Sequence, residues 1–196
     1  MKTRLVSKNA HKARELAVLL PDWEIEPTVA DELPAEVGGS FYENARAKAV
    51  FGRTVDPPDR WVLGEDSGLE VDGLGGRPGI YSARYAGPGA TDEENVAKLL
   101  EELAGAAEDA RRARYVSELV CISPTGEELR GTGVLEGSIA PAPRGSEGFG
   151  YDPVFVPLGQ ELTVAELGNR WKAQRSHRAR AARKLREAVG SAAPGL

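Results

Sequence analysis

The sequence has few of the residues that form disulfide frameworks or histidine metal sites. Its 196 residues include one cysteine, Cys121, and two histidines, His11 and His177, which most of the chain separates. A single cysteine leaves no internal disulfide, and two distant histidines offer no histidine-based metal site. Any bound metal is therefore expected to have oxygen ligands, which favours Mg²⁺ or a similar hard cation.

Long apolar segments are also absent. No uninterrupted apolar run approaches the roughly 20 residues that span a bilayer. The first residues, MKTRLVSKN, lack the apolar middle of a signal peptide. We therefore expect a cytoplasmic protein that has no membrane partner.

Two common nucleotide-binding patterns are missing as well. Neither GxxxxGK[ST] nor GxGxxG occurs in the chain. Gly131 and Gly133 come closest to the second pattern, but Glu136 occupies the position of its last glycine. If the protein binds phosphate, a different segment must do so.

The composition is that of a globular protein. Hydrophobic residues make up 41% of the chain and charged residues 28%, so neither disorder nor a fibrous repeat is indicated. A chain of this length can bury one substantial core, or a core that two lobes share. We expect one domain over residues 1–190 and a flexible tail over residues 191–196.

A strongly basic segment lies near the end of the chain. Residues 170–186 carry eight Arg or Lys residues and no acid, so this segment is +8 and, at a net charge of −5, the rest of the chain is −13. A basic segment on an acidic protein suggests a site for a small polyanion, whereas a protein that binds nucleic acid is usually basic over a wider surface. The alternative is a solvated helix face.

Strand and helix patterns alternate along the chain, which predicts an α/β fold. Capping boxes at Ser40–Glu43 and Thr91–Glu94 mark two helix starts, and Ser67 and Gly68 are expected to turn the chain after the third strand. The expected strands cover residues 2–7, 23–27, 60–64, 114–123, 127–140 and 153–156. The expected helices cover about residues 10–20, 41–53, 91–103 and 163–189.

Four carboxylates lie close together after the third strand, at Glu65, Asp66, Glu70 and Asp72. Such acids repel one another unless they are solvated or a cation lies among them. If the strand continues through Glu65 and Asp66, these two side chains face opposite ways, so one can bind metal while its neighbour anchors local structure. The alternative is that the acids decorate a turn; for Glu70 and Asp72 this alternative stays open, and for Glu65 and Asp66 we favour function.

The junction between the first strand and the first helix is a candidate phosphate site. A helix N-terminus presents free N–H groups and a partial positive charge, and polar side chains add donors at the same point. Asn9 is a natural N-cap for this helix. Any capped helix after a strand looks similar, so the segment alone does not decide between a phosphate site and a plain helix start. Its residues are Ser7, Lys8, Asn9, Ala10, His11 and Lys12.

Two later segments contain residue types that suit a purine nucleotide. Glycines around Phe149 let the backbone approach a ligand closely, and the ring of Phe149 or Tyr151 can stack on a flat ring; an ordinary turn with core aromatics is equally compatible. Lys172, His177 and Arg178 supply donors for phosphate or for the carbonyl edge of a purine. His177 also fits a half-buried structural histidine. If the segment is helical, Lys172 shares a helix face with Ser176.

Six segments together resemble the motif series of the inosine triphosphate pyrophosphatase family, also called the dITP/XTP pyrophosphatases. They follow one another in order from about residue 4 to residue 189, and six motifs in order are far more specific than any one of them. The segments are Ser7 to Lys12, Ser40 to Ala45, Glu65 to Leu69, Gly75 to Tyr85, Phe149 to Pro153 and Ser176 to Arg178.

The resemblance implies a fold and a reaction. The fold is an elongated mixed central sheet flanked by helices, with two lobes and a cleft between them, usually in a homodimer. The reaction is Mg²⁺-dependent hydrolysis of a nucleoside triphosphate between its α and β phosphates, which yields the monophosphate and pyrophosphate. The preferred substrates are deaminated purine nucleotides (ITP, dITP and XTP), so the role is cleaning the nucleotide pool.

The resemblance also implies roles for individual residues. Asp66 is the expected catalytic base and a metal ligand, together with Glu65 and with Glu36, which lies by spacing where the family has a metal-binding acid. The capping-box position of Glu43 already explains that residue, and the choice between a metal ligand and a helix cap alone stays open. The expected substrate-binding residues are Ser7, Lys8, Asn9, Ala10, His11, Lys12, Ser67, Phe149, Gly150, Tyr151, Asp152, Lys172, His177 and Arg178.

The sequence departs from the family pattern at two motifs. Lys8 stands where many members have glycine, and Glu65 stands where many have aspartate. Two other functions stay open: a regulatory module that senses purine nucleotides without cleaving them, and a pyrophosphatase that acts on pyrimidine or modified nucleotides.

Overall fold

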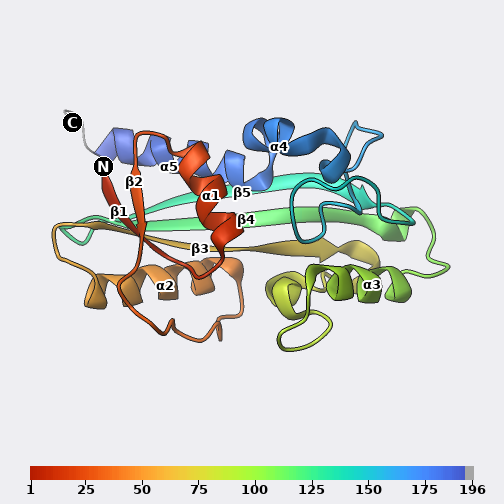
Figure 1. Ribbon diagram of the computed structural model, residues 1–196, viewed down its shortest axis with the longest axis horizontal. Helices are drawn as coiled ribbons and strands as arrows, with labels where there is room; N and C mark the ends of the chain where they lie inside the picture. The colour runs from red at the N-terminus through yellow and green to blue at the C-terminus, as the bar shows by residue number, and fades with distance from the viewer. Residues whose placement is uncertain (193–196) are drawn as a thin grey trace. The chain divides into compact units, whose positions relative to one another are not determined.

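The computed structural model describes residues 1–192, which form an α/β fold around a six-stranded sheet (Figure 1). The strands, in the spatial order β2-β1-β3-β4-β5-β6, span Lys2–Val6 (β1), Glu24–Pro27 (β2), Trp61–Val71 (β3), Arg112–Ile122 (β4), Glu128–Ile139 (β5) and Phe155–Pro157 (β6). The α-helices span Ala10–Leu19 (α1), Phe41–Val55 (α2), Asp92–Glu102 (α3), Val164–Arg175 (α4) and His177–Ala192 (α5). Short 3₁₀ helices span Asp72–Leu74, Gly79–Arg84 and Asp109–Arg111.

The sheet is mixed in strand direction. β1 pairs in parallel with both β2 and β3, whereas β6 pairs antiparallel with β5. The α/β fold with a mixed central sheet flanked by helices, predicted from the sequence, is confirmed. None of the described helices combines the length and the hydropathy that crossing a membrane requires.

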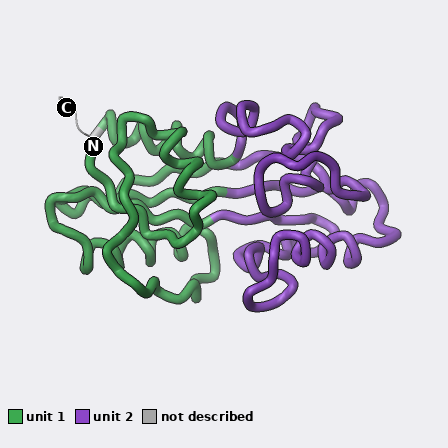
Figure 2. Tube along the Cα trace, viewed as in Figure 1, with its two compact units in different colours: residues 1–66, 117–133, 177–196 green, residues 67–116, 134–176 purple. Residues whose placement is uncertain are grey.

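The chain divides into two compact units (Figure 2). Unit 1 contains Met1–Asp66, Ser117–Gly133 and the described residues from His177 onward, and unit 2 contains Ser67–Val116 and Val134–Ser176. The sequence predicted one domain over residues 1–190, and this stays a prediction. The chain passes from one unit to the other after Asp66, Val116, Gly133 and Ser176. Of the expected flexible tail, residues 191 and 192 belong to α5, and residues 193–196 lie outside the described residues.

In unit 1, helices cover both faces of the strands: α1 and α5 lie on one face, and α2 lies on the other (Figure 1). Leu63 of β3 packs with Leu16 of α1 and Leu185 of α5 in one core cluster. Ala45 of α2 packs against Val120 of β4 in another. Because both faces are covered, the start of β3 is apolar at successive positions and shows no polar alternation.

Two glycines let helices approach the strands of unit 1 closely. A Cβ atom on Gly64 of β3 would lie 2.0 Å from the carbonyl oxygen of Ala45 in α2. A Cβ atom on Gly133 of β5 would lie 1.9 Å from the carbonyl oxygen of His177 in α5. Both distances are far below any normal contact, so only glycine fits. The Gly131-x-Gly133 pattern therefore serves helix packing.

Unit 2 has its own core. Leu69 and Val71 of β3, Leu99 of α3, Tyr115 of β4 and Phe155 of β6 belong to one buried cluster. α3 begins at the predicted capping box, since Glu94 N donates to Thr91 Oγ1 at 3.2 Å and Thr91 N donates to Glu94 Oε2 at 2.7 Å. The helix start inferred from the sequence is thus confirmed.

Two sequence predictions are wrong. Ser67 and Gly68 do not turn the chain; β3 continues through them to Val71, because its later residues are needed in the core of unit 2. Residues 163–189 do not form one helix. Gly168 has φ 82°, and Ser176 is extended with φ −62° and ψ 163°, so Ser176 ends α4 and shares no continuous helix face with Lys172.

Candidate active site

Strand pairing brings the acids of β3 beside the start of α1. Val6 pairs with Gly64 in the parallel β1–β3 register, so Ser7 follows next to Glu65. The side chain of Glu65 reaches residues of α1 and α5, whereas that of Asp66 reaches residues of α2. The predicted alternation of these two acids along a continuous strand is confirmed.

Asp66 is held in a buried polar cluster. Its Oδ2 accepts a hydrogen bond from Asn44 Nδ2 at 3.1 Å, and its Oδ1 lies 3.4 Å from Lys48 Nζ. Burial raises the pKa of Asp66 above its ordinary value, although the Lys48 ammonium opposes this shift. A carboxylate with a raised pKa is a better proton acceptor near neutral pH.

Lys48 joins two carboxylates. Its Nζ contacts the carboxylate of Glu36 and that of Asp66, and it donates to the carbonyl oxygen of Glu65 at 3.0 Å. Burial would lower the pKa of Lys48, but the carboxylates of Asp66 and Glu36 raise it above the ordinary value, so the ammonium stays charged.

The sequence interpretation missed Asn44 and Lys48. They lie four residues apart on α2, so they share a helix face, and Phe41, Ala45 and Ala49 of that face are buried. Polar residues on the buried face of an amphipathic helix are the signal that would have identified both of them.

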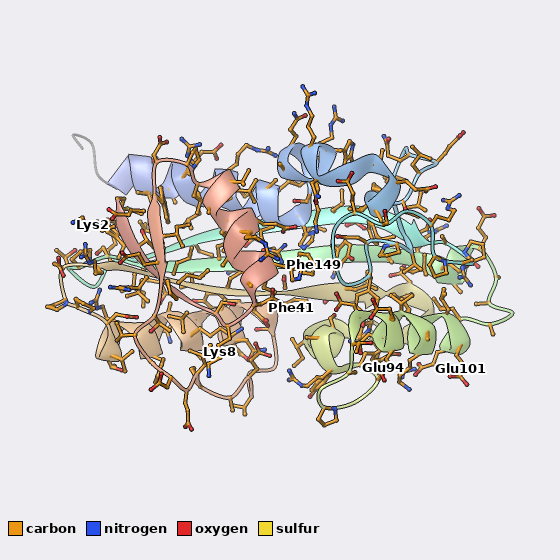
Figure 3. The ribbon with its side chains drawn as sticks, in the orientation of Figure 1. Lys2, Lys8, Phe41, Glu94, Glu101 and Phe149 are labelled. Carbon is orange, nitrogen blue, oxygen red and sulfur yellow. The ribbon has the colours of Figure 1, made fainter. Side chains whose placement is uncertain are left out.

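The start of α2 holds the loop that carries Glu36. Asn44 Oδ1 accepts a hydrogen bond from Gly38 N at 2.9 Å, and Glu43 Oε2 accepts one from Gly39 N at 2.6 Å. Only half of the predicted capping box forms, because Ser40 Oγ accepts from Glu43 N while the Glu43 carboxylate binds Gly39. Glu43 is exposed, and its carboxylate holds the loop before α2 through the N–H of Gly39. Figure 3 labels Phe41, the first residue of this helix.

Glu65 lies in a separate network of ion pairs. Its Oε2 is 2.8 Å from Lys12 Nζ, and its Oε1 is 3.1 Å from Arg178 Nη2. The other terminal nitrogen of Arg178, Nη1, contacts Glu15. Burial would raise the pKa of Glu65, but Lys12 and Arg178 together lower it well below the ordinary value. Glu65 is therefore ionised and paired with two cations.

The three acids expected to bind metal are thus not brought together. Glu36 and Asp66 meet at Lys48, whereas Glu65 points to the other face of β3. Among residues 1–192, no group of three or more Asp, Glu, His or Cys side chains is placed to hold a metal ion. Of the three carboxylates, only those of Glu36 and Asp66 share a contact, through Lys48.

The candidate phosphate segment begins α1 as predicted. Asn9 Oδ1 accepts hydrogen bonds from His11 N at 3.0 Å and from Lys12 N at 3.1 Å, and Ser7 Oγ accepts one from Asn9 N at 3.2 Å. The predicted N-cap is confirmed. Because the cap already engages the N–H groups of His11 and Lys12, phosphate binding here would depend on the side chains and on rearrangement of the cap.

A pocket of about 400 Å³ opens beside this segment. Ser7, Lys8, Asn9 and Ala10 line it. The other lining residues are Leu5, Ala13, Ile25, Pro27, Thr28 and Ala30. Lys8, which stands where many family members have glycine, contacts the carbonyl oxygen of Asp31 in the loop after β2. Lys8 thus ties the candidate phosphate segment to the loop that carries Glu36.

In unit 2, Asp152 organises the aromatic segment. Its Oδ2 accepts hydrogen bonds from Phe149 N at 3.0 Å and from Lys172 Nζ at 2.5 Å, and its Oδ1 accepts one from Tyr115 OH at 3.4 Å. Lys172 Nζ also lies 4.1 Å from the centroid of the Phe149 ring. The predicted residues Phe149, Asp152 and Lys172 therefore form one cluster within this unit.

The two aromatic residues of this segment have different roles. Tyr151 is buried in the core of unit 2, and its hydroxyl donates to the carbonyl oxygen of Ser82 at 2.8 Å. Burial raises the pKa of Tyr151, which keeps the hydroxyl protonated. Phe149 is only partly buried, and the ammonium of Lys172 lies over its ring. The N–H of Gly150 is engaged by Asp92 at 2.6 Å.

The remaining predicted residues are distributed over both units. Ser67 is half-buried in unit 2, directly after Asp66 in β3. His177 and Arg178 begin α5 in unit 1, where both are buried, His177 at 5% and Arg178 at 1% exposure. The guanidinium of Arg178 is committed to Glu65 and Glu15 in this structure.

Comparison with known proteins identifies the family of this chain. The model of a family described as the Ham1 family matches residues 3–188. A dITP/XTP pyrophosphatase of Bdellovibrio bacteriovorus is 46% identical over 184 residues, which cover 92% of each chain. One of Thermus thermophilus is 43% identical over 200 residues, which cover 99% of this chain and 94% of the relative.

A solved structure supports the same assignment. The Staphylococcus aureus Ham1 protein matches with a TM-score of 0.87 at 35% identity, over 98% of this chain and 100% of that one. The resemblance to the dITP/XTP pyrophosphatases that six motifs indicated is thus confirmed. Since the family model and these relatives match nearly the whole length, this chain belongs to the Ham1 family.

Proposed function

We propose that this protein hydrolyses the deaminated purine nucleoside triphosphates ITP, dITP and XTP to the monophosphate and pyrophosphate, and so removes them from the nucleotide pool. Membership of the Ham1 family, with relatives named dITP/XTP pyrophosphatase, supports this reaction. The observation that carries the proposal is the convergence of Glu36 and Asp66 on Lys48. It gathers two carboxylates, one of which is the candidate base, around one buried ammonium.

The proposed cofactor is Mg²⁺, held by Glu36 and Asp66. These residues fit the ion, because their carboxylates already converge on a cation, the Lys48 ammonium. Mg²⁺ in proteins usually takes one or two carboxylates together with the phosphates of the substrate. When bound, the ion neutralises charge on the phosphate oxygens and makes the phosphoanhydride easier to break.

Asp66 is the proposed general base. Asn44 fixes one of its oxygens at 3.1 Å, and burial raises its pKa, so the carboxylate is oriented and is a better proton acceptor than an exposed aspartate. The hydroxide equivalent then forms a new P–O bond while the α–β phosphoanhydride bond breaks. The electron pair of that bond leaves with pyrophosphate.

The other predicted residues are proposed to bind the nucleotide. Ser7 to Lys12 would contact the triphosphate through their side chains, and so would Lys48, which the sequence did not single out. The ammonium groups of Lys12 and Lys48 favour anions. Phe149 would stack on the purine. Lys172 would favour the acceptor oxygen at position 6 of hypoxanthine and xanthine, whereas the amino group of adenine would face another donor. We also propose a homodimer, on the family resemblance alone, and a cytoplasmic location, as expected from the sequence.

Product analysis tests the function. The purified protein is incubated with Mg²⁺ and, separately, ITP, dITP, XTP, GTP, ATP and UTP, and products are separated by anion-exchange chromatography. We expect IMP and pyrophosphate from ITP, and much slower turnover of GTP and ATP. Binding of ITP without products would favour a regulatory module, and a preference for UTP would favour a pyrimidine nucleotide pyrophosphatase. IDP and phosphate as products would refute the proposed bond cleavage.

A further inference from the structure

The ammonium of Lys48 occupies the place of a bound cation. Lys48 is 7% exposed, and its Nζ contacts a carboxylate oxygen of Glu36, Oδ1 of Asp66 at 3.4 Å and the carbonyl oxygen of Glu65 at 3.0 Å. Three oxygens from the loop after β2 and from β3 thus surround one positive charge. This set of carboxylate and carbonyl oxygens is also the type that hard divalent cations bind.

A divalent ion and this ammonium compete for the same oxygens. An ammonium has three donors, and those of Lys48 are directed at Glu36, Asp66 and the Glu65 carbonyl. An ion that takes the oxygens of Glu36 and Asp66 removes both anionic partners of a buried cation and adds like charge beside it. Buried charges that lose their partners are strongly unfavourable.

We propose that Lys48 is the resident counter-ion of Glu36 and Asp66 in the nucleotide-free protein, and that a divalent metal binds these carboxylates only when Lys48 gives them up. The proposal rests on the proposed function in one respect, namely that the nucleotide carries a polyphosphate. The polyphosphate offers Lys48 new anionic partners, so nucleotide and metal strengthen each other's binding by linkage. Lys48 is then a positioning residue that delays metal binding until substrate is present.

Metal binding to the nucleotide-free protein tests the proposal. Free Mn²⁺ is measured by electron paramagnetic resonance during titration of wild type, Lys48→Met and Lys48→Arg. Methionine has a similar length and no charge, so we expect Lys48→Met to bind Mn²⁺ at least about tenfold more tightly than wild type, a difference of about 1.4 kcal/mol. Lys48→Arg retains the charge and is expected to bind as weakly as wild type. Adding Asp66→Asn to Lys48→Met should abolish the gain.

The sign of the change separates this role from a structural one. If Lys48 only held the loop that carries Glu36, its loss would loosen the carboxylates and weaken Mn²⁺ binding. Equal or weaker binding by folded Lys48→Met therefore overturns the proposal. If circular dichroism shows that Lys48→Met does not fold, an NMR experiment on the wild type tests the proposal instead. Saturating Mg²⁺ must shift the ¹⁵N resonance of Lys48 Nζ, assigned by its loss in Lys48→Arg, and an unchanged resonance overturns the proposal.

These measurements involve no turnover, so their failure is distinguishable from failure of the proposed function. A protein that does not hydrolyse ITP but binds Mn²⁺ more tightly as Lys48→Met would refute the pyrophosphatase and leave Lys48 as the counter-ion. A protein that releases IMP and pyrophosphate, but whose Lys48→Met variant binds Mn²⁺ no more tightly than wild type, would support the pyrophosphatase and refute Lys48 as the counter-ion.

Discussion

Replacement of Arg178 by methionine tests the buried network that joins α5 to β3 and α1. Arg178 is 1% exposed, and its Nε and Nη2 lie 3.3 Å and 3.1 Å from Glu65 Oε1, while its Nη1 contacts Glu15. Methionine fills much of the same space but supplies no charge. It leaves the fully buried carboxylate of Glu65 with Lys12 as its remaining cationic partner among the ion pairs described above.

The size of the effect follows from this burial. Removing one partner of a buried ion pair typically costs about 3–5 kcal/mol, because the other charge remains desolvated. Lys12 still compensates part of the charge of Glu65, so we expect the lower end, about 3 kcal/mol. For a chain of this length, about 2–4 °C of Tm corresponds to each kcal/mol, so the expected fall in Tm is about 6–12 °C.

Thermal unfolding followed by circular dichroism at neutral pH measures the change. Lys184→Met is the matched control, because Lys184 is exposed on the same helix, and substitutions at such sites usually change stability by less than about 0.5 kcal/mol. Adding Glu65→Gln to Arg178→Met should recover at least about 1 kcal/mol, since it removes the uncompensated charge. A Tm for Arg178→Met equal to that of the control would refute the reasoning.

Three further outcomes are expected. Asp66→Asn should keep the fold and nucleotide binding but lower kcat by about 10²–10⁴-fold, the usual contribution of a general base, and a wild-type rate would remove Asp66 from the mechanism. Gly64→Ala should destabilise the protein by about 1–3 kcal/mol or more in urea unfolding, because its Cβ would lie 2.0 Å from the Ala45 carbonyl oxygen. Gly190→Ala is its control, since a Cβ on Gly190 meets nothing within 4 Å, and equal effects of the two would contradict the packing argument. The folded state holds the pKa of Glu65 below its ordinary value of 4.5, so ionised Glu65 stabilises the protein above about pH 4.5 and this contribution is lost as the pH falls further. Wild-type Tm should therefore decline more steeply below about pH 4.5 than that of Glu65→Gln, and parallel profiles would count against the network.

Local chemistry made much of the fold predictable. The caps at Asn9 and Thr91 begin helices where the sequence indicated, because a cap depends on side-chain and backbone groups only a few residues apart. The opposite directions of Glu65 and Asp66 follow from strand alternation, which is also local. The end of β3 was not predictable in this way, because residues distant in the sequence determine whether Ser67 continues a strand into a second core.

The candidate site shows the same division. Position in the sequence and the motif series singled out Asp66 and Glu36, but nothing near Lys48 in the chain shows which carboxylates it will meet. Its partners come from a loop 12 residues before it and a strand 18 residues after it, and only packing of α2 on β3 brings them together.

The sequence by itself determined the family, the alternation of strands and helices, and the residue types available for metal and phosphate, since these depend on composition, spacing and local hydrogen bonding. Only the tertiary structure decided that Glu65 pairs with Lys12 and Arg178 while Glu36 and Asp66 share Lys48. The reason is physical: the pairing of buried charges depends on which helix covers which face of a strand, and that arrangement forms when segments far apart in the chain pack together.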